Sequence, residues 1–71
     1  MNGAYQRIRT TASGDATIAM SDLNGAWEIT RYDLVTGEKT RLEELPYEGW
    51  EDRRAARAMA QGYVESYAGA N

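Results

Sequence analysis

Residues 45–69 of the chain read LPYEGWEDRRAARAMAQGYVESYAG, and this stretch decides the fold. Pro46 is the only proline, and after it the apolar side chains recur at the spacing of an amphipathic helix. At about 100° per residue they fall on one stripe, which consists of Ala56, Met59, Ala60, Tyr63, Val64 and Tyr67. The pattern predicts a helix over about residues 50–68 that buries one face.

Before Pro46 the apolar residues recur at the two-residue period of β-strands, and turn-forming residues separate these runs. Alternating apolar and polar residues predict strands over about residues 4–11, 16–20, 27–33 and 39–43. Turn-forming residues separate them, namely Ser13-Gly14-Asp15, Asn24-Gly25 and Thr36-Gly37-Glu38. We therefore expect one small α+β domain over residues 1–71, an antiparallel meander of three or four strands with one C-terminal helix packed on one face.

The composition limits the chemistry that the protein can perform. The chain has 71 residues and a net charge of −3, and it contains neither Cys nor His. This excludes disulfides, thiolate or imidazole metal sites, and catalysis by Cys or His. The neighbouring carboxylates Glu43-Glu44 and Glu51-Asp52 point in different directions on a strand or a helix, which is poor geometry for acid–base catalysis. We expect a protein that is not an enzyme and has no cofactor and no metal site.

The sequence also bears on location and origin. No run of about 18 apolar residues occurs, and the first residues, MNGAYQRIRTTA, lack the apolar segment of a signal peptide. These features predict a cytoplasmic protein that does not bind membranes. Arg greatly outnumbers Lys, and Ala and Gly are frequent, which is typical of bacterial or phage proteins encoded by GC-rich genomes.

One helix can cover only one face of the sheet, so side-chain alternation assigns each strand residue to a covered or an uncovered face. We expect the covered face to contain Ile8, Ile18, Met20, Trp27, Ile29 and Leu42. The uncovered face would then contain Tyr5, Arg7, Arg9, Thr11, Thr17, Ala19, Glu28, Thr30, Tyr32, Lys39, Arg41 and Glu43. Its four cations and two carboxylates would give this face a charge of +2.

This uncovered face is the first candidate for a binding surface, through Tyr5, Arg7, Arg9, Tyr32 and Arg41. In the favoured interpretation the protein is a small regulator or inhibitor that occupies a surface of a macromolecular partner, in the first place a protein. In the alternative, the Tyr rings stack on the bases of a single-stranded nucleic acid and the cations contact phosphates. An ordinary solvated sheet face would carry the same types of residue, and the acidic net charge counts against nucleic acid. An exposed edge strand would also permit homodimerisation.

The second candidate surface is the start of the helix, with Tyr47, Trp50, Arg53, Arg54 and Arg57. Arg53 and Arg54 lie four and three residues before Arg57, and like charges at these spacings mildly destabilise a helix. Either a partner uses these cations or the neighbouring acids neutralise them on a solvated surface. Trp50 either fastens the start of the helix to the sheet or is exposed as an anchor for a partner.

Gly62 interrupts the middle of the predicted helix. A glycine there costs about 1 kcal/mol relative to alanine, so its presence needs a reason. We expect it to make room for an aromatic side chain of the sheet, such as Trp27, with a functional kink as the alternative.

Overall fold

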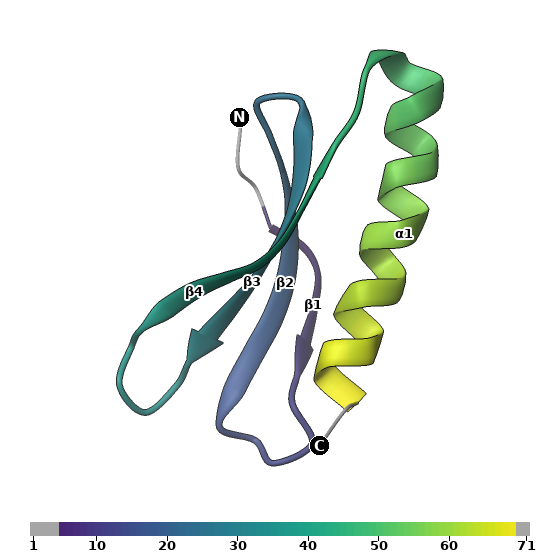
Figure 1. Ribbon diagram of the computed structural model, residues 1–71. Helices are drawn as coiled ribbons and strands as arrows, with labels where there is room; N and C mark the ends of the chain where they lie inside the picture. Colours follow the sequence, from purple (N-terminus) through teal and green to yellow (C-terminus); the bar gives the residue numbers. More distant parts are fainter. Residues whose placement is uncertain (1–4, 70–71) are drawn as a thin grey trace.

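The computed structural model describes residues 5–69, which form a four-stranded antiparallel sheet with one helix on one of its faces (Figure 1). The elements are β1 (Tyr5–Thr10), β2 (Ala16–Leu23), β3 (Ala26–Asp33), β4 (Lys39–Pro46) and α1 (Gly49–Gly69). The strands lie in the sheet in the order β1-β2-β3-β4, so each strand pairs with its neighbour in sequence. The predicted α+β meander with one C-terminal helix is confirmed, with four strands.

Strands β2, β3 and β4 extend further than the sequence predicts. Asn24 and Gly25 have φ values of 52° and 80°, as in the two-residue turns that match the twist of a hairpin, so β2 and β3 pair up to the turn itself. The last strand continues through Pro46, which stands opposite Ala26. Proline is tolerated there because β4 is an edge strand and one side of its backbone needs no partner.

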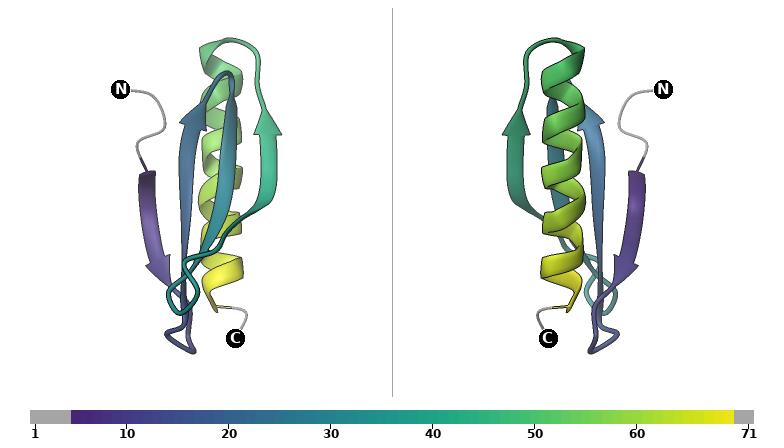
Figure 2. Two further views of the ribbon diagram at one scale, coloured as in Figure 1. Left: turned by 90° about the vertical axis from the view of Figure 1, so that its left-hand side faces the viewer. Right: turned by 90° about the vertical axis from the view of Figure 1, so that its right-hand side faces the viewer.

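The hydrophobic core lies between α1 and the two central strands (Figure 2). Its buried members are Ile18, Met20, Trp27, Ile29, Ala56, Ala60, Val64 and Ala68. Three of the four residues that α1 contributes are alanines, so the bulk of the core comes from the sheet. The largest of these side chains is Trp27, whose indole Nε1 donates a hydrogen bond of 3.2 Å to the backbone oxygen of Arg53. This bond satisfies the one polar atom of the buried ring.

The buried stripe of α1 is narrower than predicted. It follows every fourth residue through Ala56, Ala60, Val64 and Ala68. The prediction that Met59 belongs to the core is wrong, because its side chain lies at the edge of the stripe and is 58% exposed. The expectation for Gly62 is also wrong: a Cβ atom at this position would meet no atom within 4 Å, so the glycine makes room for no sheet aromatic.

A β-bulge in β1 changes which of its side chains face the helix. Arg7 and Ile8 together stand opposite the single residue Ala19, and Arg7 has the left-handed φ of 47° that the first residue of such a bulge can adopt. The extra residue reverses the alternation that follows it. Ile8 therefore lies on the uncovered face, where it is 53% exposed, and its predicted place in the core is wrong.

A second irregularity occurs in β4. Glu43 stands opposite Ile29 and Arg41 stands opposite Thr30, so Leu42 is the additional residue, and it packs against the core. As a result, Glu43 faces the helix, where its Oε2 accepts a hydrogen bond of 2.6 Å from the hydroxyl of Tyr67. The prediction that Glu43 lies on the uncovered face is wrong.

The bulge in β1 predicts that alanine substitutions of two isoleucines, Ile18 and Ile8, change the free energy of unfolding by different amounts, although regular alternation would bury both side chains. Ile18 is 1% exposed, and Ile18→Ala is expected to lower the free energy of unfolding by about 2–5 kcal/mol. Ile8→Ala is expected to change it by less than about 0.5 kcal/mol, because its side chain is half in water. Urea denaturation of both variants, followed by Trp fluorescence, measures the difference. Equal losses would place Ile8 in the core and contradict the bulge.

Candidate functional site

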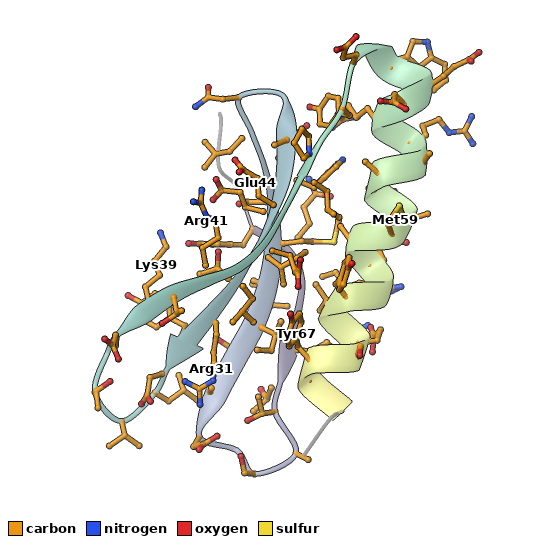
Figure 3. The ribbon with its side chains drawn as sticks, in the orientation of Figure 1. Arg31, Lys39, Arg41, Glu44, Met59 and Tyr67 are labelled. Atoms are coloured by element: carbon orange, nitrogen blue, oxygen red, sulfur yellow. The ribbon has the colours of Figure 1, made fainter. Side chains whose placement is uncertain are left out.

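Within residues 5–69 no element packs on the face of the sheet opposite α1, and the side chains of this face form what we call the open sheet face (Figure 2). Its members include Tyr5, Ile8, Thr10, Thr17, Ala19, Ser21, Glu28, Thr30, Tyr32, Lys39, Arg41 and Glu44. In Figure 3, Lys39, Arg41 and Glu44 point away from the helix, whereas Tyr67 lies between helix and sheet. Of the predicted sheet-face residues, the structure brings Tyr5, Tyr32 and Arg41 onto this face.

A shallow hollow of about 70 Å³ lies at the centre of the open sheet face. Its floor includes Ala19 and Thr30, which are only 7% and 4% exposed although no helix or strand of the described part of the chain covers them. The larger side chains of Tyr5, Ile8 and Tyr32 stand around this floor and remain partly exposed themselves. The hollow is therefore a preformed depression with apolar walls, rather than a flat solvated sheet surface.

The sheet is strongly twisted (Figure 1), and side chains from its two edge strands meet over the open sheet face. Tyr5 belongs to the edge strand β1 and Lys39 to the opposite edge strand β4, yet the Lys39 Nζ atom lies 5.8 Å from the centroid of the Tyr5 ring. This contact passes over the two central strands. A hydrogen bond with Tyr5 raises the pKa of Lys39 above its usual value, so the ammonium group at this rim is charged at neutral pH.

The charges of the open sheet face balance. Arg41 Nη1 lies 3.3 Å from Glu28 Oε2 and 3.7 Å from Glu44 Oε2, so this arginine is shared between two carboxylates. Among residues 5–69, Lys39 has no carboxylate oxygen within 4.0 Å. The face thus has a local positive charge at Lys39 and a local excess of negative charge beside Arg41, with no net charge where +2 was expected.

The predicted placement of Arg7 and Arg9 on this face is wrong. The bulge directs both side chains to the helix side of β1, where Arg7 Nη1 lies 3.5 Å and Arg9 Nε lies 3.0 Å from Glu65 Oε2. Two cations that sequence alternation assigns to a binding surface instead hold the C-terminal half of α1 against β1. No local sequence signal announces this change, because Arg7 is not a residue type that favours a left-handed backbone.

The start of α1 is fastened to the sheet by a carboxylate that the sequence did not single out. Asp22 Oδ1 accepts a hydrogen bond of 2.5 Å from the hydroxyl of Tyr47, and its Oδ2 accepts one of 2.7 Å from Arg53 Nε. The Arg53 guanidinium also lies 5.2 Å from the centroid of the Trp27 ring. Two of the predicted helix-start residues, Tyr47 and Arg53, are therefore committed to holding the fold together.

The other helix-start residues remain at the surface. Trp50 is 65% exposed and does not fasten the helix to the sheet, and the Arg54 guanidinium lies 5.4 Å from the centroid of its ring. Arg57 Nη2 lies 3.5 Å from Gln6 Oε1 of β1. Because α1 lies on the other side of the sheet, these residues and the open sheet face cannot form one site.

Further features that would indicate a function are missing from the described part of the chain. Residues 5–69 contain no cluster of three or more His, Cys, Asp or Glu side chains suited to a metal ion. Within the same residues, no helix has both the length and the apolar composition needed to cross a membrane. Comparison with protein-family models, with curated proteins and with solved structures found no match. The function of the chain therefore has to be inferred from the geometry of the open sheet face.

Two substitutions at Arg7 test the bulge that forms this face. Both Arg7→Gly and Arg7→Val remove the contact with Glu65, so their difference isolates the backbone conformation. Glycine accepts a positive φ without strain and is expected to keep the free energy of unfolding within about 1 kcal/mol of the wild type. Valine is expected to lower it by about 1–3 kcal/mol, since a β-branched residue is strained there. Chemical denaturation measures both, and equal stabilities would argue against the left-handed backbone.

The Asp22 contacts predict a pH dependence of stability. Burial raises the pKa of Asp22, but the hydrogen bonds from Tyr47 and Arg53 outweigh this effect and hold the pKa below its usual value. A carboxyl group with a lowered pKa in the folded state stabilises the fold above the unfolded pKa of about 4, and this contribution is lost as the pH falls through the folded pKa. Asp22→Asn is expected to cost about 1–3 kcal/mol at neutral pH. Thermal unfolding from pH 7 down to acid should show the two proteins converging, and a constant difference would contradict this role of Asp22.

Proposed function

We propose that this chain is a small non-enzymatic binding protein that acts as a regulator or inhibitor by occupying a surface of a protein partner with its open sheet face. The observation that carries the proposal is the position of Ile8. The bulge turns this side chain away from the core and places it between Tyr5 and Tyr32, at the wall of a hollow that no element of the described structure covers. Apolar and aromatic centres with a polar rim are typical of protein–protein interfaces.

The same geometry gives less support to single-stranded nucleic acid as the partner. A stacking platform needs cations beside its aromatic rings to follow the phosphates. Arg7 and Arg9 pair with Glu65 on the other side of the sheet, which leaves Lys39 and Arg41 as the cations of the open sheet face. Glu28 and Glu44 flank Arg41 and would repel a phosphate backbone.

Pairing of two copies through an edge strand also receives less support. The edge strand β1 contains the bulge at Arg7, and the edge strand β4 contains Pro46 and four charged residues. Bulges, prolines and charges are the features by which natural sheets avoid edge-to-edge pairing. The open sheet face is therefore the stronger candidate for the contact with a partner.

Two matched substitutions test the proposal. Ile8 and Met59 are similarly exposed, at 53% and 58%, on opposite sides of the molecule, so Ile8→Glu and Met59→Glu introduce the same charge with little effect on folding. In affinity capture from a lysate of the source cells, a specific partner should be lost with Ile8→Glu and retained with Met59→Glu, because only the first change places a charge in the proposed interface. Circular dichroism and thermal unfolding verify that both variants fold.

Direct titration of labelled single-stranded DNA and RNA at low salt separates the two classes of partner. The proposal predicts no binding that depends on Tyr5 or Tyr32. Binding that weakens steeply with added salt and is lost in Tyr32→Ala would replace the protein partner by a nucleic acid. A protein captured equally by both glutamate variants would remove the open sheet face as its binding surface.

A further inference from the structure

The size of the hollow limits what can enter it. An apolar cavity that holds benzene measures about 150 Å³, and the hollow of the open sheet face, at 70 Å³, is roughly half that size. It has room for one aliphatic side chain and is too small for an aromatic ring to enter fully. Ala19 forms part of the floor, and Tyr5, Ile8 and Tyr32 form the walls.

The polar atoms around the hollow do not call for a polar ligand. In residues 5–69 no buried side-chain nitrogen or oxygen lacks a hydrogen-bond partner, and the hydroxyl-bearing side chains that line the hollow are those of Thr17 and Thr30. A ligand group with several hydrogen-bonding atoms would lose water on entering and would find only these two hydroxyl groups as partners. The hollow therefore favours an apolar side chain over the edge of a nucleobase.

The rim of the hollow also favours a particular charge on the partner, in addition to the apolar side chain that the hollow favours. Lys39 stands over the Tyr5 ring, and within the described residues no carboxylate oxygen lies within 4.0 Å of its ammonium group, which Glu28 attracts only over a longer distance. Arg41, in contrast, already shares Glu28 and Glu44. A partner that covers the hollow would bury the surroundings of Lys39, and a carboxylate on the partner would compensate the ammonium group.

We infer that the open sheet face recognises a segment of a partner protein in which an aliphatic side chain stands next to an acidic one. The aliphatic side chain enters the hollow between Tyr5, Ile8 and Tyr32, and the carboxylate meets Lys39 at the rim. This inference rests on the proposed function, because it specifies the chemistry of the partner at the same surface.

A displayed library of random peptides, selected on the full chain at low salt, tests the inference. The enriched peptides should contain Leu, Ile, Val or Met beside Asp or Glu. Ile8→Glu should weaken their binding at least about thirtyfold, because it places a charge in the hollow. Lys39→Glu should weaken it about three- to tenfold, and replacing the acidic residue of the peptide by Lys should restore binding to this variant.

Matched controls separate the specific effects from a change in net charge. Arg54→Glu changes the net charge by the same amount as Lys39→Glu but lies at the start of α1, and it should leave peptide binding unchanged. Met59→Glu is the control for Ile8→Glu. Fluorescence anisotropy with synthetic copies of the enriched peptides gives the dissociation constants.

The possible outcomes distinguish the inference from the proposed function. If the enriched peptides depend on Ile8 but contain no acidic residue, or if Lys39→Glu and Arg54→Glu bind them equally, the open sheet face binds proteins and the inferred partner chemistry is wrong. If no peptide is enriched, the inference is contradicted, and the affinity capture with Ile8→Glu and Met59→Glu decides on the proposed function. If Ile8→Glu and Met59→Glu bind the enriched peptides equally, both the inference and the proposed function are contradicted.

Discussion

The left-handed backbone at Arg7 is the constraint on which the arrangement of this small protein depends. Because β1 contains one additional residue at Arg7, each side chain that follows in this strand lies on the face of the sheet opposite to the one that regular alternation would give it. On the helix side the bulge supplies Glu65 with two arginine partners, which ties α1 to an edge strand that contributes nothing to the buried core. On the other side it supplies Ile8 to a hollow that would otherwise lack one wall. The attachment of the helix and the shape of the open sheet face therefore both depend on the bulge at Arg7.

The helix is held at its two ends and packs closely in between. At its start, Asp22 receives hydrogen bonds from Tyr47 and Arg53, and near its end the backbone oxygen of Ala68 accepts a bond of 3.2 Å from the amide of Ala12. Between these points, mainly alanine side chains face the sheet, so the helix can lie close to Trp27. A chain with few large aliphatic residues can form a dense core in this way, because close approach replaces side-chain volume.

The sequence predicts those parts of the fold that depend on local chemistry. The Asn24-Gly25 turn, the four strands and the helix after Pro46 follow from residue types and spacing, and all are present. The face assignments fail where they assume unbroken alternation, at Ile8 in β1 and at Glu43 in β4. Each bulge shifts the pattern by one residue, and a shift of one residue moves the following side chains to the other face.

Side-chain positions at the two candidate surfaces were harder to predict than the fold, because contacts between residues distant in the sequence decide several of them. Tyr5 and Tyr32 lie where alternation places them, since neither follows a bulge on its strand. Asp22, which fastens the helix, could not be recognised because its partner Arg53 lies 31 residues away in the sequence. Trp50 could have been buried or exposed, and only the packing of the helix start decides this.

The open sheet face and the core draw on different side chains of the same strands. In β2 and β3 the residues that stabilise the fold, such as Ile18 and Ile29, alternate with the residues that line the hollow, such as Thr17 and Thr30. Substitutions on one face can therefore change binding without emptying the core, which lets a chain of marginal size vary its surface. Arg7 is the exception, because its backbone determines both the attachment of the helix and the exposure of Ile8. At this position, stability and the shape of the binding surface cannot change independently.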